Sequence, residues 1–417
     1  MRSPILRVIC SVLGILLCLV LILNAGKYGF SRLLTRYALS SNSLVAANEA
    51  VTITPADAEA HRARAVVLDH MRLTADGTRE MEVAARLRPH DDSIWLALGG
   101  LRDALDDSAG ALNAYDQAVR FAPFYAHTNW ERGNLKLRMG RYDEAFSEMR
   151  QAAAKNPNLL PTFIDLALGV SRDDVTMAEG LVQINDDRSR LAFARTLASK
   201  GRGEDALKQL QLLKTPVSRD TRLELVRQLI AAKCYREGFE LWNSESSNHD
   251  LPVIVDGGFE SSLSINNTGF GWRFATGEQK IEMSQDATER QSGTRSLKIN
   301  FGGHSSPGNL LLSQYLVVEP DRSYRINYAV KSREIVSGGL PVITVDDVDS
   351  GETLARSEPI AESTDGWRSA SFTFTAKSTA KAVVLGLRRN YCQTSPCPIF
   401  GVVWLDSFSI EALPKAQ

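Results

Sequence analysis

The distribution of apolar residues divides the 417-residue chain into three segments with different periods. An uncharged run rich in Leu, Val and Ile extends from Val8 to Gly26 and has about the length that crosses a bilayer, roughly 20 residues. A segment with helical spacing follows, over residues 38–243. From Val253 onward, short runs alternate between apolar and polar positions, which is typical of strands. The pattern predicts a multidomain α + β chain with an N-terminal transmembrane helix, a helical region and an antiparallel β-sandwich.

The N-terminal run is interpreted as an uncleaved membrane anchor, with its flank covering residues 1–37. Arg2 and Arg7 precede it, as they also would in a cleaved signal peptide. The run is long for a signal, however, and Leu23-Asn24-Ala25 is a poor cleavage site. Cys18 lacks the small residue that a lipoprotein signal places before it. Orientation stays open from charge alone, since three basic residues follow the run: Lys27, Arg32 and Arg36.

The helical segment contains a repeat of 34 residues. Proline recurs at this step, and small residues keep the same register: Pro55, Pro89, Pro123 and Pro157, with Gly99 and Gly133, Ala111 and Ala145, and Ala118 and Ala152. One unit runs from Trp95 through Leu98 and Tyr115 to Pro123. This spacing resembles the tetratricopeptide repeat, except that Arg102 stands where an aromatic residue is usual.

The resemblance implies a solenoid of antiparallel helix pairs, with five to six pairs between residues 38 and 243. In this family the first helix of each pair lines the concave face, where ligands are held. Trp130 is interpreted either as an anchor for a protein partner or as a side chain packed under the neighbouring unit, and both alternatives stay open. The residues expected in the protein-binding groove are Arg62, Asp69, Leu96, Asp103, His127, Trp130, Asn134 and Arg138.

A separate all-β domain is predicted over residues 253–417, after a Ser/Asn-rich linker at 244–252. Turn residues such as Pro320-Asp321 separate its short strands. Many short strands separated by turn residues in this way indicate an antiparallel sandwich. The predicted strands are Ser296–Phe301, Leu310–Val318, Tyr324–Val330, Val342–Val345, Ser369–Thr375, Ala382–Leu387 and Val402–Ile410.

The order of motifs in this domain carries a second resemblance. Asp256-Gly257-Gly258-Phe259-Glu260 opens it, Gly271-Trp272 follows, and Asp365-Gly366-Trp367 precedes a final strand containing Leu405-Asp406-Ser407-Phe408. This order resembles the jelly-roll carbohydrate-binding modules and the wider galactose-binding-like group. The resemblance implies glycan contacts from aromatic and polar side chains, with core packing as the alternative for the two tryptophans: Trp272, Trp367, Arg388, Arg389, Asn390 and Tyr391. It also implies a structural calcium near Glu260 and Asp406.

Cys392 and Cys397 are interpreted as a local disulfide. Two free thiols are the alternative, while zinc would need two further ligands that the sequence does not offer. A disulfide implies an oxidising compartment and therefore an extracytoplasmic C-terminus, in the periplasm or at the cell surface. Packing explains the remaining three cysteines: Cys10, Cys18 and Cys234.

Charge and motif content narrow the function further. Lys plus Arg is 48 against 49 for Asp plus Glu, so no basic surplus favours nucleic acid. The chain has no nucleophile elbow, zinc-protease helix or phosphate loop, which indicates a non-catalytic protein without a cofactor. The acidic stretch Asp346-Asp347-x-Asp349 with Glu352 is interpreted as a solvated turn.

The resulting hypothesis is a membrane-anchored scaffold of the bacterial cell envelope. It would bind a protein partner through the repeats and glycan through the β-domain, in surface polysaccharide assembly or export. One rival is a pure protein–protein assembly factor that binds no sugar. A glycan-processing accessory enzyme is the third reading, and it would need carboxylates clustered in a cleft.

Overall fold

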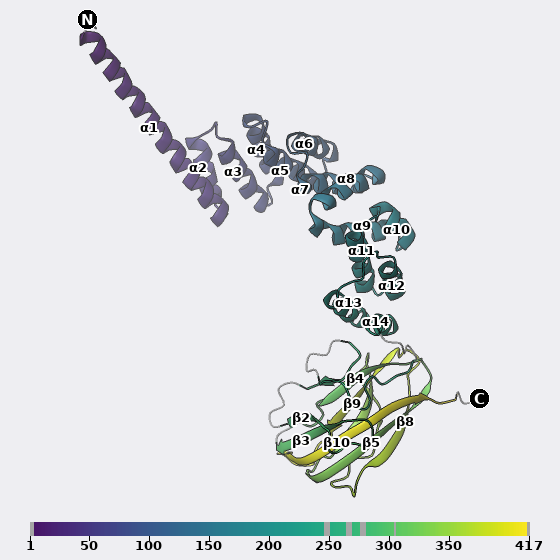
Figure 1. The fold of residues 1–417 in the computed structure, drawn as a ribbon. Coiled ribbons are helices and arrows are strands. Elements are labelled where there is room, and N and C mark those ends of the chain that lie inside the picture. Colours follow the sequence, from purple (N-terminus) through teal and green to yellow (C-terminus); the bar gives the residue numbers. More distant parts are fainter. Residues whose placement is uncertain (1–3, 246–250, 264–268, 276–280, 304–305, 415–417) are drawn as a thin grey trace. The chain divides into compact units, whose positions relative to one another are not determined.

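The computed structural model describes residues 4–245, 251–263, 269–275, 281–303 and 306–414, with side chains from residue 11 onward. These residues form fourteen α-helices followed by ten strands (Figure 1). The chain divides into two compact units, Met1–Ile184 and Asn185–Gln417. The second unit contains the last two helix pairs together with the sandwich.

The helices follow one another as antiparallel pairs. In the first unit they are α1 (Pro4–Ser41), α2 (Leu44–Ile53), α3 (Ala58–His70), α4 (Thr74–Leu87), α5 (Asp92–Ala104), α6 (Ser108–Phe121), α7 (Ala126–Arg138), α8 (Tyr142–Lys155), α9 (Leu160–Val170) and α10 (Val175–Val182). A short 3₁₀ turn, η1 (Pro157–Leu159), precedes α9. In the second unit they are α11 (Asp187–Ser199), α12 (Gly203–Gln211), α13 (Arg219–Ala231) and α14 (Tyr235–Trp242).

The repeat prolines mark the ends of second helices, as predicted. Helices α4, α6 and α8 each end two residues before a repeat proline, because proline disfavours helical geometry in the residue that precedes it. The small residues mark close crossings. A Cβ atom at Gly99 would lie 2.4 Å from the Tyr115 ring, so only glycine lets α5 and α6 approach this closely. The pairing confirms the tetratricopeptide-like architecture.

Helix α1 supplies the first helix of the leading pair. The sequence predicted only a second helix there, and assigned residues up to 37 to the anchor and its flank. In the structure, Ser31 and Ala38 are fully buried, and the Ser31 hydroxyl donates to the Ala50 carbonyl of α2 at 3.1 Å. One continuous helix thus carries the apolar run and the start of the helix array.

The ten strands form two five-stranded antiparallel sheets. Sheet A has the order β1-β4-β9-β6-β7, and sheet B has the order β2-β3-β10-β5-β8. The strands are β1 (Arg273–Phe274), β2 (Ile281–Asp286), β3 (Ser296–Gly303), β4 (Leu312–Val317), β5 (Ser323–Val336), β6 (Pro341–Asp347), β7 (Thr353–Arg356), β8 (Arg368–Thr375), β9 (Ala382–Arg389) and β10 (Ile399–Ala412). All seven predicted strands are present, and β1, β2 and β7 are additional.

One apolar core fills the space between the two sheets. Sheet A contributes side chains such as Leu312 and Leu385, and sheet B contributes Ile299 and Val403. Along each strand these residues alternate with side chains that face away from the core. We call the side of sheet A that faces away from this core its outer face.

The acidic stretch after Val345 is not a solvated turn throughout. Asp346 and Asp347 end strand β6 and are only 5% and 4% exposed. The turn itself begins after them, where the Asp347 carboxylate accepts from the Ser350 amide at 2.7 Å. The sequence prediction was wrong for these two aspartates, because their burial depends on sheet A.

Helix α14 joins the sandwich through an aromatic cluster within the second unit. The ring centroid of Phe270 lies 5.4 Å from that of Phe239 and 6.2 Å from that of Trp242. Gly269 has φ +111°, and a Cβ atom there would lie 2.4 Å from the Trp242 ring. The predicted linker falls between these partners, and its residues 246–250 lie outside the described residues.

Candidate ligand-binding face of the sandwich

Strand β4 shows how the outer face of sheet A is built. Leu312 and Leu316 point into the core, so the residues between them, Ser313 and Tyr315, point outward. Gln314 also points inward, where its amide exchanges two hydrogen bonds of 2.9 Å with the backbone of Val255. These bonds satisfy a buried polar side chain and tie the start of the domain to sheet A.

A half-open cavity of about 320 Å³ lies on this outer face. That volume is at the lower end of the roughly 300–1,000 Å³ typical of small-molecule sites. Its lining combines one cation, one aromatic ring and several small or apolar groups: Arg273, Phe274, Ala275, Leu310, Ser313, Tyr315 and Val384. Three strands contribute, since Ser313 pairs with Arg273 of β1 and Tyr315 pairs with Val384 of β9.

Arg273 and Tyr315 are stacked at the wall of this cavity. The guanidinium carbon lies 3.8 Å from the centroid of the phenol ring, well within cation–π range. The Nε atom of Arg273 is buried and has no hydrogen-bond partner among the described residues. A buried donor left in this state costs about 1–3 kcal/mol. Arg273 therefore brings a positive charge to the wall of the cavity, while its Nε atom is covered by the protein.

Two other aromatic rings pack against Tyr315. The centroid of Phe270 lies 6.4 Å away, and that of Tyr235, from α14, lies 6.2 Å away. Burial raises the pKa of Tyr235 to about 12, with a further contribution from the nearby Asp349 carboxylate. Tyr235 is therefore uncharged at physiological pH. The orientation of Tyr315 is set by its packing against Tyr235 and Phe270.

The neighbouring part of the face contains a buried ion pair. The guanidinium of Arg388 in β9 binds the carboxylate of Asp346 in β6. Thr353 of β7 donates to the other oxygen of Asp346 at 2.7 Å. Of the predicted glycan-binding residues, Arg388 is the one that the structure places on this face, and it lies there already paired.

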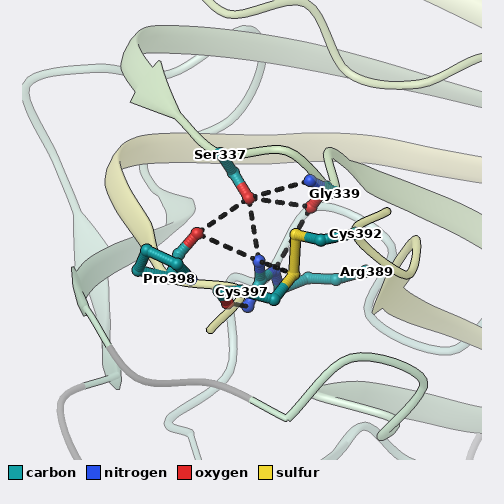
Figure 2. The surroundings of a disulfide bond; sticks show 6 residues. All are labelled: Ser337, Gly339, Arg389, Cys392, Cys397 and Pro398. Carbon is teal, nitrogen blue, oxygen red and sulfur yellow. Dashed lines mark hydrogen bonds between the residues drawn. A yellow bond between two sulfur atoms is a disulfide. The ribbon is translucent and has the colours of Figure 1, made fainter. Parts of the chain in front are cut away.

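The disulfide predicted between Cys392 and Cys397 is present. Figure 2 shows its surroundings, where Arg389 fills the space inside the loop. This guanidinium is only 1% exposed and donates to the carbonyl of Cys397 at 3.0 Å and to the hydroxyl of Ser337 at 2.8 Å. Arg389 therefore organises the loop and is not a glycan contact, contrary to the sequence prediction.

Tyr391 at the start of this loop is 77% exposed. Its hydroxyl lies beside Gly308, where a Cβ atom would come within 2.5 Å of the Tyr391 oxygen. Asn390 is half-buried, and its backbone amide donates to the Leu340 carbonyl at 3.0 Å. Tyr391 is thus a surface aromatic, as predicted, two residues beyond the end of β9.

The two predicted glycan-binding tryptophans do not lie on the outer face of sheet A. Trp272 is 4% exposed, stacks on Phe259 at 5.1 Å and donates to the Asp256 carbonyl at 2.9 Å. It is a core residue, so this site prediction is wrong. Trp367 is half-buried and directly precedes β8, at the edge of sheet B.

Glu260 and Asp406, near which the resemblance implies a structural calcium, both bind the backbone of one loop in the structure. Calcium needs six to eight oxygen ligands, whereas both carboxylates here already accept hydrogen bonds from one loop. Asp406 accepts from the amides of Gln291 and Ser292 at 2.7 and 3.0 Å, and Glu260 accepts from the amide of Thr294 at 2.8 Å. In the part of the chain that the structure describes, no group of three potential metal ligands occurs. We derive no role for a metal here.

Several of the predicted groove residues already have side-chain partners within the helix array. Arg138 forms an ion pair with Asp103 of the preceding unit, and Arg62 forms one with Glu59 at 2.7 Å. Asp69 accepts from the Thr74 hydroxyl at 2.8 Å. Of the other groove positions, His127 is exposed, and Leu96 and Asn134 are half-buried. Trp130 is the exception, because it is only 7% exposed. Trp130 is therefore packed into the array, which is the second of the two alternatives that the sequence left open.

The sequence reasoning missed the residues that line the cavity. Alternation within the predicted strand Leu310–Val318 separates Ser313 and Tyr315 from their core neighbours, so part of the signal was present. Arg273 carried no such signal, because its two-residue strand is too short to show a period.

Comparison with known proteins supports the fold of the C-terminal domain. A family model described as a carbohydrate binding domain matches residues 251–389. No curated protein sequence matches the chain. The C-terminal domain is thus similar to carbohydrate-binding domains, and the helix pairs are of the tetratricopeptide type.

Several solved structures are similar to parts of the chain. MamA from Desulfovibrio magneticus RS-1 is 17% identical, covering 38% of this chain and 92% of its own, with a TM-score of 0.34. Pseudomonas aeruginosa pilF is 17% identical, covering 54% and 99%, with a TM-score of 0.35. The CBM22-1 xylan-binding domain of Xyn10C from Paenibacillus barcinonensis is 17% identical, covering 39% and 96%, with a TM-score of 0.26.

Proposed function

We propose that this protein is a non-catalytic, membrane-anchored scaffold whose sandwich binds a saccharide on the outer face of sheet A. The observation that carries the proposal is the cavity beside Tyr315, with the Arg273 guanidinium over the Tyr315 ring at its wall. Apolar side chains next to a few polar donors suit a sugar, which presents C–H faces and hydroxyl groups together. The match to a carbohydrate binding domain supports the same ligand class.

The saccharide proposal is tested with a glycan array probed with the full chain in detergent. We expect binding that is lost when Val384→Phe fills the cavity from its outward-facing wall. Tyr391→Ala serves as the matched test of the exposed loop aromatic, and it should have a smaller effect because Tyr391 does not line the cavity. A folded chain that binds no glycan would favour the rival protein–protein assembly factor.

Helix α1 is proposed to stay in the membrane as an uncleaved anchor. Its segment Ser11–Ser41 is long and apolar enough to cross a bilayer, and its apolar side chains lie open, with Leu23 70% exposed. Such a helix needs a lipid environment to cover it. N-terminal sequencing of the mature protein should find the original N-terminus, whereas a start near Gly26 would contradict the anchor. The disulfide supports an extracytoplasmic location for the sandwich.

The helix array is proposed to bind a protein partner, in a complex that assembles or exports envelope polysaccharide. The surface offered consists of exposed and half-buried positions on the first helices α5 and α7, namely Leu96, His127 and Asn134. His127→Ala combined with Asn134→Ala should weaken capture of a purified partner while leaving thermal unfolding unchanged. Loss of capture only on destabilisation of the array would contradict this surface.

A further inference from the structure

The charge on the outer face of sheet A is positive and largely uncompensated. Arg273 makes no ion pair with any described residue, and its Nε–H lacks an acceptor. Its guanidinium carbon lies over the Tyr315 ring, 3.8 Å from the ring centroid. A guanidinium that is stacked and unpaired is already oriented for an incoming anion, because its donors form a rigid planar fork.

A second arginine without an ion pair among the described residues, Arg356, lies on the opposite edge strand of sheet A. Strand register places Arg273, Ser313, Gly386, Thr344 and Arg356 opposite one another across all five strands of sheet A. Arg356 is exposed and likewise has no ion pair among the described residues. Neighbouring strands are about 4.8 Å apart, so the two arginine Cα atoms are separated by roughly 19 Å. The row contains no acidic residue.

The middle of the row carries no charge and is bordered by a neutralised ion pair. Gly386 has no side chain, and a Cβ there would lie 2.3 Å from the Leu310 side chain, which covers it. Thr344 is fully buried. The carboxylate of Asp346, which borders the row, is already bound to Arg388 and to Thr353. It is therefore not available to neutralise either terminal arginine.

We propose that the ligand of this face is an acidic saccharide that lies across the strands and places an anionic group on Arg273. The inference rests on the proposed saccharide-binding function and adds the chemical class of the sugar. A carboxylate or sulfate group accepts two hydrogen bonds from a guanidinium fork, whereas a sugar hydroxyl leaves its charge unpaired. Arg356 meets a second anionic group of a longer chain at the other end of the row.

The alternative is that Arg273 only covers Tyr315. In that case the charge is solvated at the mouth of the cavity, and a neutral sugar binds as well as an acidic one. The two cases differ in the response to the anionic group and to salt, since an ion pair at a half-open site is screened by added salt.

The experiment compares matched probes on the full chain in detergent. Oligosaccharides containing uronic acids are paired with the same oligosaccharides after reduction of their carboxyl groups to alcohols, and sulfated oligosaccharides form a third arm. We expect the acidic member of a pair to bind at least about tenfold more tightly, and the difference to shrink at high salt. A preference for uronates over sulfated probes identifies the anionic group as a carboxylate, and the reverse identifies it as a sulfate.

Two arginine variants and one control test which residues cause the preference for the acidic probe. Arg273→Gln should abolish the difference in affinity between the acidic probe and its reduced counterpart, and Arg356→Gln should reduce this difference only for longer oligosaccharides. The matched control is Arg333→Gln, which removes an exposed arginine of β5 in sheet B. Equal binding of both members of a pair, or an equal effect of Arg333→Gln, overturns the inference while the saccharide-binding function stands. Binding of no saccharide by the folded chain defeats the proposed function itself.

Discussion

Glu260 and Asp406 hold the two ends of one loop. The carboxylate of Asp406 accepts from the amides of Gln291 and Ser292, and the carboxylate of Glu260 accepts from those of Thr294 and Arg295. The two acids are 146 residues apart in the chain, and the loop closes the start of β3. The resemblance assigned them to a metal, whereas the structure shows them binding the backbone.

Asp406→Asn should destabilise the sandwich. Asp406 is fully buried, and the substitution replaces a charged acceptor by a neutral amide whose NH₂ group opposes the two loop amides. We expect a loss of about 2 kcal/mol in urea unfolding, the size of a hydrogen bond to a charged group. Glu260→Gln, on an exposed side chain, is the control and should cost clearly less. Equal losses would contradict a role based on burial.

Removal of calcium should leave the stability unchanged. The oxygens of both acids are occupied by amide donors, so a cation has no set of free ligands there. Thermal unfolding of the full chain with and without a calcium chelator checks this. A melting temperature that falls with chelator and recovers with added Ca²⁺ would show that the carboxylates are metal ligands after all.

Asp286 should make the stability of the sandwich depend on acid pH. Burial raises the pKa of Asp286, but hydrogen bonds from Thr288 and from the Trp404 indole outweigh this and hold it well below its usual range. An aspartate in the unfolded chain titrates near pH 3.9. Its stabilising contribution is therefore complete above that pH and is lost as the pH falls toward the lower folded pKa.

The measurement is urea unfolding of wild type and Asp286→Asn at pH 7, 5 and 3. The difference in free energy of unfolding should be similar at pH 7 and 5 and smaller at pH 3. Glu282→Gln, an exposed acid in the same strand β2, is the control and should show a smaller effect at every pH. A difference for Asp286→Asn that does not change with pH would exclude its carboxylate as the cause.

Trp130→Ala should destabilise the helix array. The side chain is 7% exposed, and truncation of a buried tryptophan costs roughly 3–5 kcal/mol. Arg138→Ala on the same helix is the control, because its side chain is 55% exposed and its ion pair with Asp103 adds little. Thermal unfolding compares the two variants. An unchanged melting temperature for Trp130→Ala, together with lost partner capture, would restore the tryptophan as a groove anchor.

The Cys392–Cys397 disulfide should contribute about 2 kcal/mol, because a loop this short has little entropy to lose. The double variant Cys392→Ser, Cys397→Ser is compared with wild type in urea. The buried Arg389 still donates to the carbonyls of Cys397 and Pro398 in this variant, so the loop should stay ordered. Mass spectrometry that finds both thiols free in protein from its native compartment would contradict the bond.

The sequence alone determined the order of the domains and the ends of many helices. Proline cannot continue a helix and glycine alone permits close crossings, so Pro89, Pro123 and Gly99 mark the same points in the sequence and in space. Alternation likewise located seven of the ten strands. These are local constraints, which act between residues close in the chain.

Only the tertiary structure decided which face of each strand meets the core. Trp272 packs in the core, whereas Trp404 lies on the opposite side of sheet B from its core neighbours Val403 and Leu405. Trp404 is nevertheless 1% exposed, because three cationic side chains cover it: Lys298, Lys331 and Arg333. Side chains alternate between two faces along every strand. Only the packing of one sheet on the other decides which of the two faces lies in the core. The sequence also did not reveal the site at Arg273 and Tyr315. These two residues lie 42 residues apart in the chain and come together only through the pairing of β1 with β4.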